Sequence, residues 1–242
     1  MRFKAVLATA VALLLAVPAM AQDADKIKAE LKKHIPEAPV DSVRKVPYGG
    51  LYEVLVNGEI FYTDEKASFL LIGSLVDLKS KENVTEQRMR QVNKVNFSEL
   101  PLDRAIKIVR GNGSRKIAIF EDPNCSYCKR FERDLQGVND ITVYVFLYPI
   151  LSPDSVEKSK AIWCSADPGK SWIDTMTKEA IPSGNKSCPT PLDKNIAFGR
   201  DKKINGTPTI FFEDGERVPG AISMADFEKR LTTAQKAKVS SR

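Results

Sequence analysis

One stretch constrains the fold of this chain more than any other: residues 117–131, which read Ile-Ala-Ile-Phe-Glu-Asp-Pro-Asn-Cys-Ser-Tyr-Cys-Lys-Arg-Phe. Its first four residues form a short apolar run, which predicts a buried strand, and the turn that follows leads into a segment that predicts a helix. Asn124 is a good N-cap, so Cys125 is expected at the first helical position. The sequence therefore predicts a strand-turn-helix unit that carries a Cys-x-x-Cys pair at a helix N-terminus.

The Cys125–Cys128 pair indicates thiol chemistry. Unpaired backbone N–H groups and the positive end of the helix dipole favour a thiolate there, so Cys125 is predicted to be the reactive sulfur. Cys128 lies three residues on, at the same side of the first turn, as suits a resolving thiol. A zinc site is disfavoured because Cys164 and Cys188 are isolated and the single histidine, His34, lies far upstream. An inert structural disulfide is disfavoured because a helix N-terminus activates a thiol.

The first 21 residues resemble a secretory signal peptide. Arg2 and Lys4 precede an apolar run over residues 5–17, and Ala19-Met20-Ala21 is a small-x-small cleavage pattern. The run is shorter than the span of about 18 residues that a bilayer requires, and no later stretch is long and apolar enough. We therefore expect cleavage before Gln22, a soluble mature protein without membrane insertion, and export to the periplasm. A retained N-terminal anchor is the alternative.

Export permits disulfides, and the chain has four cysteines, an even number. With Cys125 and Cys128 assigned to each other, Cys164 and Cys188 are left to form a structural disulfide. The chain-entropy model assigns about 3 kcal/mol of stabilisation to a loop of this size.

Charge and length narrow the function class. The formal net charge is +6 over 242 residues. Basic and acidic residues are interspersed, without a basic patch that carries interleaved aromatic residues, so nucleic-acid binding has little support. The chain is longer than a typical single domain, and two domains are expected.

Residues 22–80 are predicted to form one helix against a small antiparallel sheet. Asp25 is expected to cap the helix, which Pro36 ends, and its apolar residues recur at helical spacing: Ile27, Leu31 and Ile35. Strands at 51–56 and 59–63 flank Asn57-Gly58, the strongest short hairpin signal, and residues 68–78 are read as a further strand-like segment. So small a domain with a free strand edge is expected to dimerise.

Residues 81–112 are predicted to be a partly helical linker, with apolar residues at helical spacing between 100 and 109 and glycines at the boundary. Residues 113–242 are then predicted to form an α/β domain that begins with a β-α-β unit and a parallel strand pair. Further helices form an insertion that carries Cys164 and Cys188. The order of elements is that of a thioredoxin fold with a helical insertion, with strands expected at 116–120, 141–148, 209–212 and 217–218 and helices to about 135 and at 156–164, 170–178, 193–198 and 224–231.

Several segments together resemble the DsbC-type periplasmic protein disulfide isomerases along essentially the whole mature chain. The resemblance rests on the glycine-containing hairpin of the N-terminal domain and on Phe-Glu-Asp-Pro-Asn-Cys-Ser-Tyr-Cys at 120–128, Ala-Ile-Trp-Cys at 161–164 and Gly-Thr-Pro-Thr at 206–209. It implies an N-terminal dimerisation domain at 22–80 and a thioredoxin-like catalytic domain at 113–242.

The resemblance also implies roles for individual residues. Cys125 and Cys128 would be catalytic, and Tyr127, Thr207 and Pro208 would contact substrate, with Pro208 in the cis form beside the cysteine pair. Ser126 stands where the family more often has glycine, so the redox potential does not carry over. Many thioredoxin-fold proteins bury an acidic residue six positions before the nucleophile. That position is Ile119 here, so the proton acceptor for Cys128 is water or another group, with Glu121 a candidate.

The implied function is isomerisation, and where rearrangement stalls reduction, of wrong disulfides in exported proteins through a mixed disulfide at Cys125. The implied partners are misoxidised exported proteins, a DsbD-type membrane reductase as electron donor, and a second copy of the chain. No cofactor and no metal are expected. One alternative is a DsbG-like protein that reduces sulfenic acids on single thiols; others are a chaperone that uses its disulfide only for structure and a DsbA-like oxidase.

Overall fold

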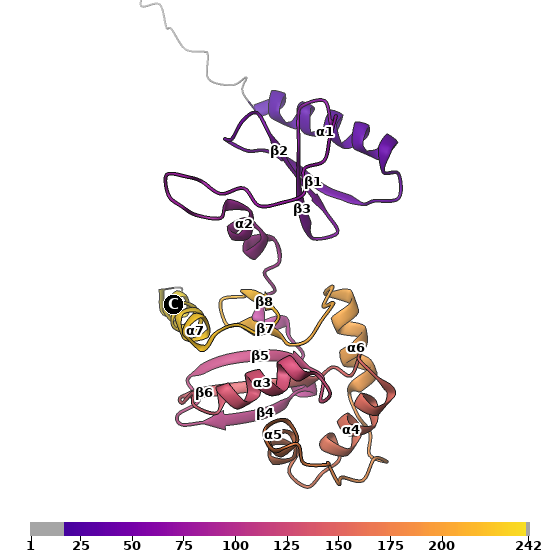
Figure 1. The fold of residues 1–242 in the computed structure, drawn as a ribbon, viewed down its shortest axis with the longest axis vertical. Helices are drawn as coiled ribbons and strands as arrows, with labels where there is room; N and C mark the ends of the chain where they lie inside the picture. Colours follow the sequence, from indigo (N-terminus) through magenta and orange to yellow (C-terminus); the bar gives the residue numbers. More distant parts are fainter. Residues whose placement is uncertain (1–16, 241–242) are drawn as a thin grey trace, which may run out of the picture. The chain divides into compact units, whose positions relative to one another are not determined.

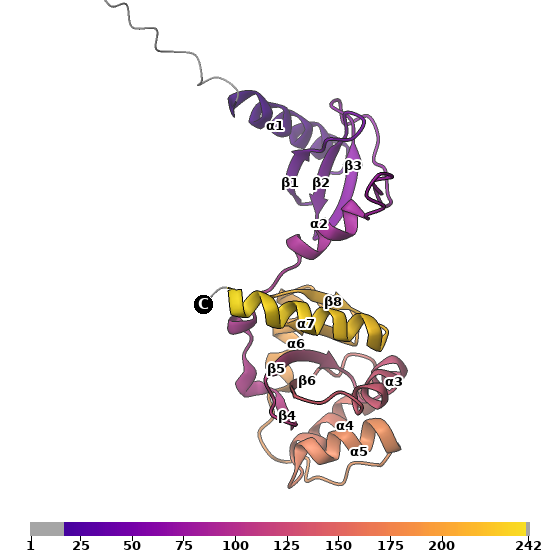
Figure 2. The same ribbon diagram turned by 90° about the vertical axis from the view of Figure 1, so that its left-hand side faces the viewer.

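The computed structural model describes residues 17–240, with side chains described for residues 23–237. Most of the predicted signal peptide, residues 1–16, lies outside the described part of the chain. The chain forms two compact units that divide after Val92 (Figures 1 and 2). Within residues 17–240, no helix is long and apolar enough to cross a membrane.

The N-terminal unit packs a helix on a three-stranded antiparallel sheet of order β1-β2-β3 (Figure 2). The elements are α1 (Val17–His34), β1 (Val40–Lys45), β2 (Tyr52–Val56) and β3 (Glu59–Thr63). Ile27 and Leu31 lie one helical turn apart on the buried side of α1 and join a core cluster with Tyr52 and Val54 of β2. The amphipathic spacing of α1 therefore determines which side of the helix covers the sheet.

The predicted hairpin is confirmed, and the start of α1 is corrected. Asn57 and Gly58 connect β2 to β3 with φ angles of 54° and 83°, the positive values that this tight turn requires. The helix begins at Val17, not after Asp25, because residues 17–25 contain good helix formers and no proline beyond the first turn. Cleavage before Gln22 would remove the first five residues of α1.

The strand predicted at 68–78 is wrong. The segment makes only isolated bridges, Tyr62 with Leu71 and Val76 with Asn83. One chain offers this stretch no complete partner strand, and its large apolar side chains remain exposed: Phe69, Leu70, Leu71, Ile72, Val76 and Leu78. We call these six residues the exposed apolar segment.

A helix, α2 (Val84–Val92), follows and confirms a helical linker. Arg88 of α2 donates to the buried carboxylate of Glu53 on β2 at 3.0 Å, and Arg44 of β1 contacts the same carboxylate at 2.5 Å. Because a buried carboxylate requires a charged partner, these two arginines hold Glu53 in place. They also join α2 to the sheet of its own unit.

The C-terminal unit is a five-stranded sheet of order β4-β6-β5-β7-β8 with helices on both faces (Figure 1). Strands β5 and β6 are parallel, as the β-α-β prediction requires, and the other pairs are antiparallel. The elements are η1 (Phe97–Glu99), η2 (Leu102–Arg104), β4 (Ile106–Arg110), β5 (Arg115–Glu121), α3 (Ser126–Leu135), β6 (Ile141–Leu147), α4 (Pro153–Trp163), α5 (Pro168–Lys178), α6 (Leu192–Asp201), β7 (Thr209–Phe212), β8 (Arg217–Pro219) and α7 (Met224–Ser240).

Side chains of β5 alternate between two core clusters. Ile117 and Ile119 face the cluster to which α3, α5 and α7 contribute. Ala118 and Phe120 face the other cluster, which includes residues from the segment before β4 and from α6. All four side chains are fully buried. This central strand is therefore covered on both faces and leads directly into the Cys-x-x-Cys turn.

The helical spacing predicted between residues 100 and 109 is wrong for the second half of this stretch, which forms strand β4. It pairs antiparallel with β6 and buries Ile106 and Ile108 while Lys107 and Val109 are exposed. That alternation has the period of two that defines a half-buried strand. The sheet therefore begins before the glycines at which the sequence suggested a boundary.

Candidate active site

The turn between β5 and α3 holds the cysteine pair, and its cap differs from the predicted one. Cys125 is the N-cap of α3, which begins at Ser126. The prediction that Asn124 caps this helix is wrong. The Asn124 amide nitrogen instead contacts Ser152 at 3.1 Å and Asp154 at 2.9 Å, so this side chain joins the turn to the start of α4.

The Cys125 sulfur takes the place that an N-cap oxygen usually takes. Its Sγ accepts a hydrogen bond from the Cys128 backbone N–H at 3.2 Å, and its thiol donates to the Thr207 carbonyl at 3.4 Å. Hydrogen bonds from the Cys128 side chain, the Thr207 side chain and the backbone at Tyr127 and Cys128 outweigh burial and lower the pKa of Cys125 to about 6. The backbone N–H groups at the start of the helix are therefore one cause of the lowered pKa, after the Cys128 side chain. That Cys125 is the reactive sulfur stays a prediction.

The Cys128 sulfur has the opposite environment. It is fully buried on the inner side of α3, in the cluster that contains Phe131 and Leu135. The pKa of Cys128 is raised, mainly by burial. The hydrogen bond to Cys125 and the charge of Glu121 raise it further. The two thiols are therefore unequal: one is poised as a thiolate and the other keeps its proton.

Residues of the 206–209 segment lie against the cysteine pair. The Thr207–Pro208 peptide bond is cis, as the resemblance implies. The Thr207 carbonyl contacts Cys125, and the Pro208 carbonyl accepts from the Gly220 N–H at 2.7 Å. Thr207, 82 residues from Cys125 in the sequence, is thus brought next to the reactive sulfur.

Tyr127 projects from the turn between the two cysteines and is 67% exposed. It borders an open hollow of about 270 Å³ whose other walls come from α3 and the segment before α7: Arg130, Phe131, Asp134, Ala221, Ile222 and Ser223. The hollow is partly apolar and adjoins the first turn of α3.

Asp122 supports the turn, and the sequence interpretation missed it. Its side chain is fully buried, with one oxygen accepting from the Asn124 N–H at 2.8 Å and the other from the Leu151 N–H at 3.0 Å. It therefore holds the cysteine turn against the loop before α4. An aspartate followed by proline and asparagine after a strand is a turn signal that could have indicated this role.

Cys164 and Cys188 form a disulfide with their Cα atoms 5.8 Å apart. Cys164 is the C-cap of α4, and Cys188 lies in the loop before α6. The bridge joins parts of the helical insertion and is separate from the Cys125–Cys128 pair, both of whose thiols are free.

In the part of the chain that the structure describes, no group of three or more His, Cys, Asp or Glu side chains could hold a metal ion.

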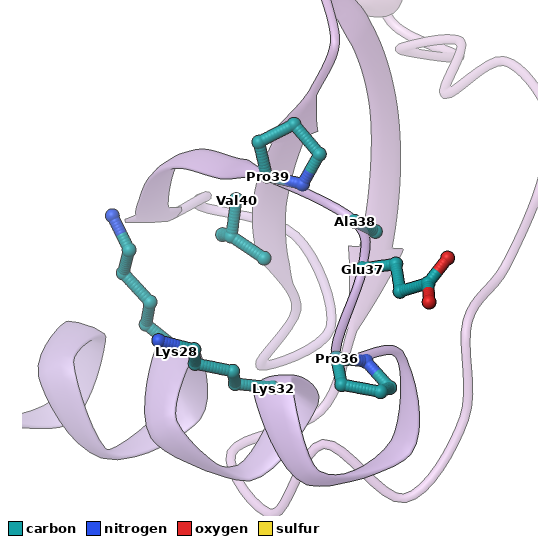
Figure 3. Close-up of a pocket in the computed structure, with 7 residues that line it drawn as sticks. All are labelled: Lys28, Lys32, Pro36, Glu37, Ala38, Pro39 and Val40. Carbon is teal, nitrogen blue, oxygen red and sulfur yellow. The ribbon is translucent and has the colours of Figure 1, made fainter.

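A hollow of about 370 Å³ in the N-terminal unit lies between α1 and the start of β1 (Figure 3). Lys28, Lys32 and Glu37 border it, and none of the predicted site residues does.

The fold and the site together define a class. A thioredoxin-like sheet, a Cys-x-x-Cys pair at the start of the helix after β5, a thiol with a lowered pKa and an adjacent cis-proline are the features of a thiol–disulfide oxidoreductase.

Comparison with known proteins gives the family. Residues 18–86 match the model of the disulfide bond isomerase protein N-terminal domain, and residues 102–235 match that of a thioredoxin-like domain. The chain is 45% identical over 208 residues to a probable thiol:disulfide interchange protein DsbC of Bordetella pertussis, covering 86% of this chain and 74% of that protein. It belongs to the DsbC family of thiol:disulfide interchange proteins, which are disulfide isomerases. The family predicted from the sequence is confirmed.

Two other relatives agree. The thiol:disulfide interchange protein DsbC of Escherichia coli is 25% identical over 202 residues, covering 80% of this chain and 82% of that protein. A crystal structure of a disulfide interchange protein from Neisseria gonorrhoeae is 40% identical, with a TM-score of 0.54 over 56% of this chain and 99% of that chain.

Proposed function

We propose that this protein rearranges wrong disulfides in exported proteins through a mixed disulfide at Cys125. The observation that carries the proposal is the inequality of the two thiols. Cys125 has a pKa of about 6 and lies at the start of α3, whereas Cys128 is fully buried with a raised pKa. A thiolate at neutral pH attacks disulfides, and a protonated, buried neighbour leaves the mixed disulfide time to rearrange.

The steps follow from these environments. The Cys125 thiolate attacks one sulfur of a substrate disulfide, forms a mixed disulfide and releases the other substrate sulfur as a thiolate. A substrate thiolate can then attack another substrate disulfide, which forms a new substrate disulfide and releases a new substrate thiolate. A substrate thiolate finally attacks the substrate sulfur of the mixed disulfide, and Cys125 leaves as a thiolate with no net oxidation. If rearrangement stalls, Cys128 attacks Cys125 and the substrate leaves reduced.

The substrate chain would lie across Thr207 and Tyr127. The contact between Thr207 and the Cys125 sulfur supports this position, since an extended chain attached to that sulfur passes the same backbone. The exposed ring of Tyr127 borders the hollow of about 270 Å³. A contact surface of backbone and a few apolar groups suits an enzyme that must accept many sequences.

The working form would be a homodimer. The exposed apolar segment of the N-terminal unit supports this proposal, with Ile72 81% and Leu78 89% exposed. Apolar side chains gathered in this way on a small unit with incomplete strand pairing are suited to covering by a second copy.

The compartment and the electron donor follow from the chemistry. The leader-like sequence at residues 1–21 supports export to the periplasm. An isomerase must hold its pair reduced in an oxidising compartment, so a membrane-bound reductase of the DsbD type would supply electrons.

Refolding of a scrambled multi-disulfide protein in a glutathione buffer tests the proposal. The mature chain should restore the activity of the scrambled protein, Cys125→Ser should not, and Cys128→Ser should retain part of the effect. Equal rescue by all three would show that the cysteine pair has no part in the reaction.

A further inference from the structure

Tyr148 connects the two segments that meet at Cys125. It follows β6 directly and is 2% exposed. Its backbone N–H donates to the carbonyl of Glu121, the last residue of β5, at 2.8 Å. Its hydroxyl donates to the carbonyl of Ile204 at 3.0 Å. One buried residue is therefore hydrogen-bonded both to the strand that leads into the cysteine turn and to the chain that leads to Thr207.

The ring of Tyr148 is held in one position by its neighbours. It packs directly against α6 at Gly199, where an added Cβ atom would lie 2.4 Å from a ring carbon and 2.7 Å from the hydroxyl oxygen. A side chain at this position would have to displace the ring. Phe120 of β5 packs against the same ring edge to face, with the two centroids 5.7 Å apart. The hydroxyl is thus fixed where it meets the Ile204 carbonyl.

A second side chain, that of Arg217 on β8, holds the same segment. Its guanidinium donates to the carbonyls of Lys202 at 2.7 Å and Lys203 at 2.5 Å. These residues follow the end of α6, where carbonyl groups lack partners within the helix and a cation is favoured. The guanidinium also lies over the Phe211 ring, 5.8 Å from its centroid. The three consecutive carbonyl groups of residues 202–204 are therefore held by side chains from outside this segment.

Residues 202–206 lead directly to the contact with the reactive sulfur. At the end of the segment, the Gly206 carbonyl accepts a hydrogen bond from the Thr209 hydroxyl at 2.8 Å. The next carbonyl, that of Thr207, contacts the Cys125 sulfur at 3.4 Å. The place of Thr207 relative to this sulfur therefore depends on where residues 202–206 are held.

We propose that Tyr148 and Arg217 are positioning residues, which hold the backbone of Thr207 where it binds a substrate chain attached to Cys125. The proposal rests on the proposed function, in which the substrate lies across Thr207. Both side chains act on the site through residues 202–204. Misplacement of a binding group by about 1 Å can slow an enzyme about 100-fold, so a distant hydrogen bond that fixes such a group affects the reaction.

The two positioning residues should affect polypeptide substrates more than small reagents. A peptide disulfide uses both the Cys125 sulfur and the Thr207 backbone, because its chain continues on both sides of the cysteine. Iodoacetamide uses only the sulfur. The ratio of the rate constant for the peptide disulfide to that for iodoacetamide therefore separates the position of Thr207 from the reactivity of the thiolate.

The test measures both rate constants on the reduced mature protein, at a pH well above the Cys125 pKa of about 6. The peptide is short and carries one internal disulfide, and its consumption is followed by mass spectrometry of acid-quenched samples. We expect Tyr148→Phe, which removes only the hydroxyl, to lower the ratio about tenfold, the effect of losing about one hydrogen bond. Arg217→Lys should lower the ratio in the same direction, because an ammonium group lacks the planar fork that binds two carbonyls.

The matched control is Tyr144→Phe, the same change at a partly buried tyrosine of β6. It should leave the ratio as in the unaltered protein. Chemical denaturation shows whether each variant is folded. If Tyr148→Phe is not folded, Arg217→Lys decides the matter in the same assay.

An unchanged ratio in a folded variant would overturn the role of the residue that it alters. An equal fall of both rate constants would overturn it as well, since this would show a general effect on the site and not on Thr207. Failure of the proposed function has a different result. A protein whose ratio falls as expected but which does not rescue scrambled proteins would refute the isomerase mechanism and leave the two positioning roles standing.

Discussion

The Cys125 sulfur lies 3.2 Å from the backbone nitrogen of Cys128 and accepts its hydrogen bond. One residue of the pair thus stabilises the thiolate of the other through its backbone, while its own sulfur remains buried. This asymmetry is produced by where α3 begins: at an N-cap, Cys125 faces the free N–H groups of the first turn, and Cys128 has already turned inward.

The reactivity of Cys125 should depend on pH with a midpoint near 6. The pKa of this thiol is lowered to about 6 from 9.0, so the thiolate is present above that pH and is lost as the pH falls through it. We expect the rate of alkylation of Cys125 by iodoacetamide in the reduced, unaltered protein to fall as the pH falls through 6. Cys128 does not compete for the reagent, because its thiol is buried and has a raised pKa. A midpoint near 9 would contradict the environment described for Cys125.

Asp122→Ala should destabilise the catalytic unit and slow Cys125. The change leaves the N–H groups of Asn124 and Leu151 without their acceptors, which costs about 1–3 kcal/mol for each buried group that water cannot reach. Chemical denaturation and the alkylation rate measure the two effects. Asp193→Ala, at the start of α6, is the control; equal effects from both substitutions would show that Asp122 has no special role.

Charged substitutions in the exposed apolar segment should dissociate the proposed dimer. Ile72→Asp and Leu78→Asp place charge on a surface that the second copy would bury, and a buried unpaired charge is strongly unfavourable. Analytical ultracentrifugation should show monomers for these variants. Leu151→Asp, also at an exposed leucine but in the catalytic unit, should leave the dimer intact. Dimers that survive Ile72→Asp and Leu78→Asp together would exclude this surface.

Arg88→Ala should destabilise the N-terminal unit by about 1–2 kcal/mol. It removes one of two cationic partners from the buried Glu53 carboxylate, while Arg44 remains. The loss is smaller than for a fully buried pair because both arginines are partly exposed. Lys33→Ala, which breaks an exposed pair with Glu30, should have little effect. Denaturant titration compares the two variants.

Local sequence signals were sufficient for elements whose residues interact mainly with near neighbours. The β2–β3 hairpin follows from Asn57-Gly58, and β7 from an apolar run before a tight turn. Strand β1 was missed because Val-Asp-Ser-Val-Arg-Lys does not alternate regularly, and its position depends on pairing with β2. Strand β4 was read as helix because the short 100–109 stretch permits both periods, and only pairing with β6 decides between them.

The same difference between local and long-range interactions holds for the residues of the candidate active site. The Cys-x-x-Cys motif identified both thiols, since the chemistry lies in adjacent residues. The contact between Cys125 and Thr207 could not be found in this way, because the two residues lie 82 positions apart in the sequence and meet only in the folded domain. The cap was misplaced by one residue because Asn124 finds partners on α4, thirty residues away. Contacts between distant segments therefore determine which polar side chains serve the site.

Trapping of the mixed disulfide tests the central claim most directly. Cys128→Ser is mixed with a scrambled disulfide protein, quenched with acid and digested without reductant, and the linked peptides are identified by mass spectrometry. We predict an accumulating adduct that joins a substrate cysteine to Cys125, and almost none in Cys125→Ser, where only the buried Cys128 remains. Adducts of equal amount through Cys128, or none through Cys125, would contradict the assignment of Cys125 as the attacking sulfur.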